Sequence, residues 1–387
     1  MPEAVIVATT RSPIGRAYKG SLIDVRADDL AGFAIDSLMK TVPEVDRASV
    51  ADVMVGCALT HHEQGFNLAR PASLLGGMPE SVPATTVNRF CASSLQTIRM
   101  AFHAIEQGEG NTYVAAGGES VTRTYGKALD AEDLNPRFTD SGRDDFIDQV
   151  YIPMGNTAEN VAAKYGITRE RMDEFAKRSQ DLAVEAQKNG FFDREITPIE
   201  VPDGRIIASD DGPRPNTTLE KLAELPPVFQ PDGLVTAGNS CPLNDGAAAV
   251  LVMSRNRADD LGLQPMARIV ASSVVGLEPE YMGMGPVGAV RAVLDQAGMK
   301  LGDIDVIEMN EAFAAQVLAS VDQLGIDMDR LNPHGGAIAL GHPFGMTGAR
   351  IMGTLLNDLR TLDKTIGLET MCVGGGQGMA MIVERLG

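Results

Sequence analysis

Four cysteines and five histidines supply the candidate nucleophiles and bases of this 387-residue chain. Cys91 stands out because it lies in Asn88-Arg-Phe-Cys91-Ala-Ser-Ser, where a β-rich run gives way to a helical pattern. A thiol at a helix start faces the positive end of the helix dipole and free N–H groups, which favour the thiolate. Taken alone, such a cysteine is more often a small buried apolar residue. Cys91 is therefore a candidate nucleophile that needs a base.

Two histidines, His334 and His342, lie on a glycine-rich stretch that precedes a helical pattern. A thiol nucleophile needs a base that works near neutral pH, and histidine meets that need. The adjacent residues His61-His62-Glu63 raise the question of a metal site. Adjacent side chains do not face one way, however, so a solvated turn is the better interpretation and we expect no metal. His103 has no catalytic setting.

Cys372 lies in Met371-Cys372-Val-Gly374-Gly-Gly-Gln-Gly, directly after a predicted strand. The glycines allow backbone N–H groups to line a cavity, as an oxyanion hole requires. The segment lacks the helix that follows a dinucleotide-binding glycine motif, since Met379–Val383 reads as a strand. Asn310 stands at another predicted strand end, where it could hold a water or an oxygen. A helix N-cap is an equally good interpretation of Asn310 alone.

The elements that must position these residues alternate between β-rich runs and helical patterns, which is typical of an α/β fold with a mostly parallel sheet. The predicted strands are Ala4–Ala8, Val53–Val55, Thr85–Asn88, Tyr113–Ala116, Ala267–Ser272, Val306–Met309, Thr365–Met371 and Ala380–Glu384. The predicted helices are Asp28–Lys40, Ser94–Glu106, Thr157–Lys164, Thr168–Asn189, Pro286–Gln296, Ala312–Leu324 and Ala349–Arg360.

The two sets of strands repeat one pattern. The matching pairs are Val53–Gly56 with Ile307–Asn310, Phe90 with Phe344, and Ile98 with Met352, each 254 positions apart (307 − 53). A constant offset over about 45 residues (98 − 53) indicates a duplicated half. The alternative is a chance likeness between two parallel-sheet halves. Between the halves lies a stretch richer in charge and proline, and an insertion of that length is usually a lid or a ligand-binding subdomain.

Composition limits the partners. The net charge is −19, from 52 acidic and 33 basic residues, and there is no Lys/Arg-rich run. Nucleic acid and anionic membranes are therefore not expected as partners. No secretory signal and no run of 18 apolar residues is visible, so we expect no membrane span. A chain of this length folds without disulfides, so four reduced thiols in a cytoplasmic protein are expected.

Together these motifs resemble the thiolase family over essentially the whole chain. The resemblance rests on Cys91-Ala-Ser-Ser, Asn310-Glu-Ala-Phe-Ala, Gly335-Gly-Ala-Ile-Ala with Gly341-His342-Pro, and Cys372-Val-Gly-Gly-Gly. It implies an α/β fold with duplicated βαβαβαββ halves, in a five-layered α/β/α/β/α arrangement with an inserted loop domain. The first half would comprise residues 1–120 and 242–265, the CoA-binding loop domain 121–241, and the second half 266–387.

The resemblance also implies a ping-pong mechanism. Cys91 would carry the acyl group, His342 would activate its thiol, and Cys372 would protonate the departing acetyl-CoA enolate. Asn310 would hold a water that binds one oxyanion with His342, and the N–H groups of Cys91 and Gly374 would bind the other. Two carbonyl groups carry negative charge in turn, so two donor sets are needed.

In family members the loop domain binds coenzyme A, which is a substrate, so no cofactor is expected. Arg214 matches an arginine near the nucleotide part. The residues that match the pantetheine tunnel are Met154, Phe229, Ala237, Ala312 and Phe313. The chain departs from the family at Cys241, where a serine usually binds the pantetheine arm, and at Pro226, which replaces a common arginine.

The resemblance favours CoA-dependent cleavage of 3-ketoacyl-CoA in fatty acid β-oxidation. The alternatives are a biosynthetic acetoacetyl-CoA thiolase and a non-catalytic lipid or CoA carrier with the same fold. It also implies a homodimer or homotetramer. Some degradative members work with a hydratase/dehydrogenase subunit, and the sequence shows no clear docking element for one.

Overall fold

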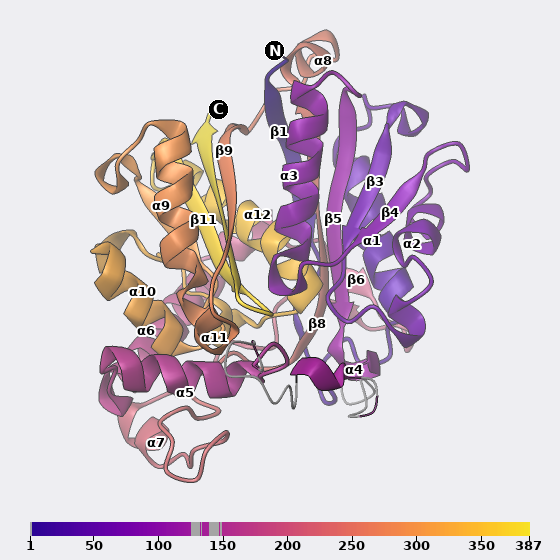
Figure 1. The fold of residues 1–387 in the computed structure, drawn as a ribbon. Coiled ribbons are helices and arrows are strands. Elements are labelled where there is room, and N and C mark those ends of the chain that lie inside the picture. The colour runs from indigo at the N-terminus through magenta and orange to yellow at the C-terminus, as the bar shows by residue number, and fades with distance from the viewer. Residues whose placement is uncertain (1, 125–131, 133, 139–146, 148) are drawn as a thin grey trace.

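The computed structural model describes residues 2–124, 132, 134–138, 147 and 149–387 (Figure 1). Its strands are β1 Ala4–Arg11, β2 Gly15–Arg16, β3 Asp52–Gly56, β4 Ala84–Val87, β5 Thr112–Ser120, β6 Ile199–Glu200, β7 Ile206–Ile207, β8 Asn244–Ser254, β9 Ala267–Gly276, β10 Val306–Met309, β11 Ile366–Val373 and β12 Gln377–Arg385. Its α-helices are α1 Ala27–Thr41, α2 Ala69–Leu75, α3 Ser93–Glu106, α4 Val121–Thr124, α5 Met154–Tyr165, α6 Arg169–Lys188, α7 Leu219–Ala223, α8 Arg255–Asp260, α9 Gly285–Ala297, α10 Ala314–Leu324, α11 Ala337–Leu340 and α12 Thr347–Thr361.

The duplication predicted from the constant offset is present in the fold. Strand β3 starts 254 positions before β10 (306 − 52), and α3 starts 254 positions before α12 (347 − 93). The strand pairing keeps the same register, since Asp52 lies opposite Tyr113 and Val306 lies opposite Gly367. Equivalent positions of the two halves can therefore be compared residue by residue.

The strand order β10-β11-β12-β9-β1-β8-β5-β3-β4 joins the two half-sheets where β1 pairs with β9. Only β3 with β4, β3 with β5 and β10 with β11 pair in parallel among the described strands. The prediction of a mostly parallel sheet is therefore wrong, and the sheet is mixed. Strands β8 and β12 are buried on both faces like parallel strands, so their hydrophobic pattern does not reveal their direction.

Helices α3 and α12 pack against each other at the centre, where α3 lies against strands of the first half and α12 against strands of both halves (Figure 1). On the outside, α1 covers β1, β5 and β8, whereas α9 covers β9, β11 and β12. This arrangement gives the layers α/β/α/β/α. The close central packing needs small residues, because a Cβ on Gly117 would lie 2.0 Å from the carbonyl oxygen of Gly345.

Helices α5, α6 and α7 belong to the predicted loop domain, which lies at the lower end of the molecule in Figure 1. Buried Arg11 on β1 binds this region, since its guanidinium donates to both oxygens of Asp210 at 2.8 and 2.9 Å and to Glu195 at 3.0 Å. The proposed boundaries 121–241 stay a prediction, and residues 125–131, 133, 139–146 and 148 of that range lie outside the described residues.

Each predicted strand and helix overlaps an observed one, with ends shifted by a few residues. One long strand, β8, is not among the predicted strands; it has eleven residues with the sequence NDGAAAVLVMS. Its alanine content lowers its β-propensity, and burial between β1 and β5 compensates for that.

Candidate functional site

Cys91 lies in a single 3₁₀ turn, Phe90–Ala92, that leads directly into α3. Phe90 adopts a φ of +45°, a conformation that costs a non-glycine residue about 1–2 kcal/mol. The Asn88 side chain supports this turn by accepting from the Phe90 N–H at 2.9 Å and donating to the Ala58 carbonyl at 2.9 Å. The turn places Cys91 at the start of the central helix, where it is only 4% exposed.

The helix start was expected to favour a thiolate at Cys91. Burial has the larger effect and raises the pKa of the Cys91 thiol, and the charges of Cys372 and Glu119 raise it further. The resting group is therefore a thiol, and the expectation of a thiolate stabilised by the helix alone is corrected. A base must take the proton during the reaction.

His342 is a neutral base. Its Nδ1 lies 2.6 Å from the Thr347 hydroxyl, and that hydroxyl donates its own proton to the Pro343 carbonyl at 2.8 Å. The hydroxyl must then accept from Nδ1–H, so Nε2 carries the free lone pair. Burial, assisted by the nearby Arg350 charge, lowers the pKa of His342 to about 3. The imidazole thus enters the reaction unprotonated.

Asn310 directly follows β10 and is 1% exposed. Its amide nitrogen lies 3.3 Å from Nε2 of His342, as a donor to a lone pair. Its Oδ1 is buried without a hydrogen-bond partner in the described part of the chain. An unpaired buried acceptor costs about 1–3 kcal/mol, which is tolerable where a water or ligand completes the site. The N-cap interpretation of Asn310 is not supported, since α10 begins at Ala314 and shows no side-chain cap.

Cys372 is the penultimate residue of β11 and is fully buried. Burial, with a contribution from Cys241, raises its pKa to about 12, so this residue is also a thiol. Cys241 acts electrostatically on Cys372, and Cys91 acts on Cys241. Cys372 in turn acts on Cys91, so the three thiols are electrostatically linked and each makes another harder to ionise.

Two backbone N–H groups are free for an oxygen. Gly374 begins the tight turn between β11 and β12, and a Cβ there would lie 2.9 Å from the Phe90 ring. Gly374 therefore sits against the Cys91 turn. Among the hydrogen bonds of the described residues, neither the Gly374 N–H nor the Cys91 N–H has an acceptor. This pair has the character of an oxyanion hole.

The residues predicted to line the pantetheine tunnel largely come together. The rings of Phe229 and Phe313 meet edge to face at 5.8 Å, and Phe229 also lies against Gly155, next to Met154. The Cys241 N–H donates to the Ala312 carbonyl at 3.0 Å. These contacts put loop-domain residues against the Asn310–Phe313 segment.

Two further predicted CoA contacts lie on the surface. Ala237 is exposed, as is Arg214. The backbone N–H of Arg214 donates to Gln180 at 2.8 Å, and no carboxylate of the described residues pairs with its guanidinium. An exposed, unpaired guanidinium suits a phosphate group of a ligand.

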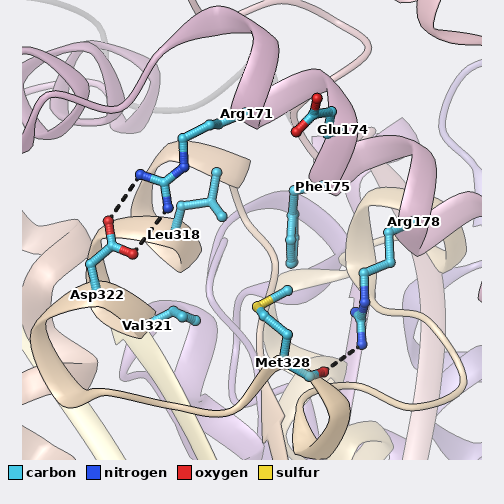
Figure 2. Close-up of a pocket in the computed structure, with 8 residues that line it drawn as sticks. All are labelled: Arg171, Glu174, Phe175, Arg178, Leu318, Val321, Asp322 and Met328. Carbon is cyan, nitrogen blue, oxygen red and sulfur yellow. Dashed lines mark hydrogen bonds and ion pairs between the residues drawn. The ribbon is translucent and has the colours of Figure 1, made fainter.

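His334 does not join the site. Its ring stacks on Phe191 at 3.7 Å, and its Nδ1 lies 2.6 Å from Asp358. A pocket of about 280 Å³ between α6 and α10 contains none of the predicted site residues (Figure 2). In that pocket Arg171 binds both oxygens of Asp322, and Arg178 donates to the Met328 carbonyl.

Three negative findings concern the described residues only. No group of three His, Cys, Asp or Glu side chains is placed to hold a metal ion. No helix there is long and apolar enough to cross a membrane. All four cysteines are free thiols.

The sequence reasoning missed Thr347 and Glu119. Thr347 selects the tautomer of His342, and Glu119 binds the Gly345 N–H at 2.8 Å in the turn that follows His342. Thr347 lies five residues after His342, at the start of a helix, and that spacing could have suggested it. Glu119 carries no signal in its local sequence, because its partners come from distant segments.

Comparisons with known proteins agree with this geometry. Residues 4–256 match the thiolase N-terminal domain, and residues 263–385 match the thiolase C-terminal domain. The chain is 44% identical to the beta-ketoadipyl-CoA thiolase of Acinetobacter baylyi, with 100% of both chains covered. It is 42% identical to the 3-ketoacyl-CoA thiolase of Bacillus subtilis, covering 99% of this chain and 100% of that one.

Solved structures show the same likeness. The dimeric peroxisomal thiolase of Saccharomyces cerevisiae superposes with a TM-score of 0.93 at 39% identity, covering 100% of this chain and 98% of that one. The acetyl-CoA acetyltransferase of Bacillus anthracis gives a TM-score of 0.91 at 39% identity, covering 100% and 99%. The chain belongs to the thiolase family and is an acyltransferase.

Proposed function

We propose that this protein catalyses the CoA-dependent cleavage of 3-ketoacyl-CoA to acetyl-CoA and a shortened acyl-CoA. The observation that carries the proposal is a buried thiol, Cys91, that adjoins two free backbone N–H donors in a site with a neutral imidazole. The relatives named 3-ketoacyl-CoA thiolase support the substrate class. Coenzyme A would be a substrate, and no cofactor would be needed.

In the first half-reaction, Nε2 of His342 takes the proton of the Cys91 thiol, and the sulfur attacks the 3-keto carbon. The bond between C2 and C3 then breaks, and its electron pair forms the enolate of acetyl-CoA. Cys372 donates its S–H proton to that carbon, and acetyl-CoA leaves. Asn310 would hold a water that, with His342, binds the enolate oxygen.

In the second half-reaction, the Cys372 thiolate takes the proton of a new CoA thiol. The CoA sulfur attacks the acyl carbon on Cys91, and the carbon–sulfur bond to Cys91 breaks. His342 returns its proton to the Cys91 sulfur, so both cysteines end as thiols. The N–H groups of Cys91 and Gly374 would bind the carbonyl oxygen of the acyl group when it becomes negative.

The CoA arm would run from Arg214 at the surface, past Ala237, between Met154 and the Phe229–Phe313 pair, to Cys241 beside the catalytic thiols. The protein would work in the cytoplasm as a homodimer or homotetramer. Edge strand β4 supports self-association, since it ends the sheet, and the neighbouring Phe66 is fully exposed. Reconstitution with a hydratase/dehydrogenase subunit would test whether the protein works with such a partner.

A second substrate has support from the names of relatives. Several relatives at 43–44% identity over 99–100% of this chain are beta-ketoadipyl-CoA thiolases, so a substrate ending in a carboxylate belongs in the same assay. We would compare 3-oxoadipyl-CoA with acetoacetyl-CoA and with longer 3-ketoacyl-CoA esters. A preference for condensing two acetyl-CoA molecules would identify the biosynthetic alternative instead.

The decisive experiment is mass spectrometry of the protein after brief exposure to an acyl-CoA, with Cys91→Ser as the comparison. We expect an acyl adduct on Cys91 in the parent. The variant should lack thiolysis and retain CoA affinity, because a serine hydroxyl is far less ionised. An adduct on Cys372 would reverse the roles of the two cysteines.

A further inference from the structure

Position-by-position comparison of the halves reveals a second copy of the oxyanion-hole turn. Cys91 lies 254 positions before Gly345 (345 − 91), and Ser120 lies 254 positions before Gly374 (374 − 120). The register of the paired strands shows that these positions are structurally equivalent. The N–H groups of Gly345 and Ser120, which we call the counterpart turn, thus repeat those of Cys91 and Gly374.

The two turns differ in what their N–H groups bind. The Gly345 N–H donates to Oε2 of Glu119 at 2.8 Å, and the Ser120 N–H donates to Oε1 of Gln64. In the catalytic turn, the equivalent donors have no acceptor among the described residues. The protein's own side-chain oxygens therefore occupy the place that a substrate oxygen would take at Cys91.

Glu119 is held in place by hydrogen-bond donors from several segments of the chain. It is fully buried, and it accepts from the N–H groups of Ala58 at 2.9 Å and Leu59 at 3.1 Å as well as from Gly345. The Gln64 amide also donates to it, and the Cys57 thiol lies 3.6 Å away as a further donor. Burial raises the pKa of Glu119, whereas the backbone N–H groups and the Gln64 amide act in the opposite direction because they favour the carboxylate.

The position of Glu119 connects both catalytic segments. Gly345 belongs to the turn that carries His342, whereas Ala58 holds the Asn88 side chain that shapes the Cys91 turn. The negative charge of Glu119 is also one of the charges that raise the pKa of the Cys91 thiol. Glu119 thus acts on Cys91 in two ways: it holds backbone segments that lead to Cys91, and its negative charge opposes ionisation of the thiol.

We propose that Glu119, supported by Gln64, is a positioning residue that occupies the counterpart turn and aligns the Cys91 and His342 segments. The proposal rests on the proposed function, since it takes Cys91 as the nucleophile. The length of the Glu119 side chain sets the positions of the two segments, and its charge makes a smaller contribution at Cys91 than burial and Cys372 do.

Two variants separate these effects. Glu119→Gln keeps the length and removes the charge, so Cys91 should ionise more readily. Glu119→Asp keeps the charge and shortens the side chain by one methylene, so only alignment should suffer. The control is Glu159→Gln, because Glu159 is a buried carboxylate that also accepts backbone N–H groups and is not among the charges acting on Cys91.

The first readout is the rate at which iodoacetamide alkylates Cys91 at pH 8, followed by peptide mass spectrometry. One unit of pKa changes the thiolate fraction about tenfold, and Glu119 contributes less to the Cys91 shift than burial and Cys372, so we expect Glu119→Gln to be alkylated faster by clearly less than tenfold. Glu119→Asp and Glu159→Gln should match the parent. An unchanged rate in a folded Glu119→Gln, or an equal rise in Glu159→Gln, would overturn the electrostatic role.

The second readout is steady-state thiolysis by Glu119→Asp, which stays informative even where Glu119→Gln fails to fold. We expect kcat to fall at least tenfold with little change in KM, because the CoA arm does not touch this region. An unchanged kcat would overturn the alignment role. Alkylation needs no substrate, so a faster alkylation without an acyl adduct on Cys91 would reject the proposed function and retain this charge effect.

Discussion

The catalytic turn at Cys91 and the counterpart turn at Gly345 share a backbone and differ in their side chains. Where the second half supplies His342, Asn310 and Cys372, the first half has other residues at the equivalent positions. These are Asn88, Gly56 and Gly118, each 254 positions earlier (342 − 88). Asn88 supports the Phe90 turn, whereas His342 presents the lone pair of Nε2, to which the Asn310 amide donates. The comparison teaches that both turns provide oxygen-binding N–H groups, and that the candidate catalytic site combines Cys91 of the first half with His342, Asn310 and Cys372 of the second half.

The largest effect is expected when His342 is replaced by asparagine, the residue found at the equivalent position, Asn88. His342→Asn removes the base and keeps a polar side chain, so kcat should fall about 10²–10⁴-fold, the usual contribution of a general base. The measurement is steady-state thiolysis together with CoA titration. A kcat within threefold of the parent would show that another group takes the Cys91 proton.

A smaller loss should follow Cys372→Ala, which makes that position nearly as small as Gly118. Turnover should drop because the enolate loses its proton donor. Cys91 should still be acylated by a simple acyl-CoA, since that transfer moves no proton at the α-carbon. Rapid-quench mass spectrometry measures both steps. Loss of acylation would mean that Cys372 also helps to form the nucleophile's site.

The third comparison concerns the cores of the two halves. In the second half, Glu308 on β10 and Glu369 on β11 lie opposite each other and are buried. Arg350 and Asp358 on α12 are also buried. Both oxygens of Glu369 lack a partner in the described structure. Burial and the neighbouring Glu308 raise the pKa of Glu369 well above its usual range, with Arg350 acting in the opposite direction. The position equivalent to Glu369 in the first half is Ala115, which cannot titrate.

Glu369 should therefore make stability fall as pH rises. Above about pH 4.3 the unfolded chain loses this proton, whereas the folded chain keeps it up to the raised pKa, so the folded state binds more protons. Each pH unit in that window costs about 1.4 kcal/mol. We expect Glu369→Gln to flatten the decline of Tm between pH 5 and 8, with exposed Glu44→Gln as the control. Parallel Tm curves for parent and Glu369→Gln would contradict this.

The smallest effect is expected at Cys241, where relatives usually carry serine. If this residue faces the pantetheine arm, Cys241→Ser should tighten CoA binding a few-fold, since one neutral hydrogen bond contributes about 0.5–1.5 kcal/mol. The chemical step should hardly change, because the arm is held alike in ground and transition states. Calorimetric titration beside a melting curve tests this. An unchanged Kd with a lower Tm would mean that Cys241 is a packing residue.

Much of this structure could be predicted from local patterns. The repeated 254-residue offset predicted the duplication, and the motifs around Cys91, Asn310, His342 and Cys372 predicted the candidate catalytic residues. Local sequence patterns do not predict how deeply a residue is buried or which distant segments come into contact. The helix start at Cys91 suggested a stabilised thiolate, yet desolvation decides its pKa. Glu119 and Gln64 are 55 residues apart, and their partnership exists only after the strands pair.

The pairing of β1 with β8 has a consequence for synthesis on the ribosome. Ala4 lies opposite Ser254, so the first strand waits for its neighbour until about 250 more residues have been made. At 5–20 residues per second this takes roughly 12–50 s. The inner face of α3 waits longer still, because α12 follows about a hundred residues later. During that interval the apolar residues of β1 and α3 that β8 and α12 later cover remain without these partners in the nascent chain.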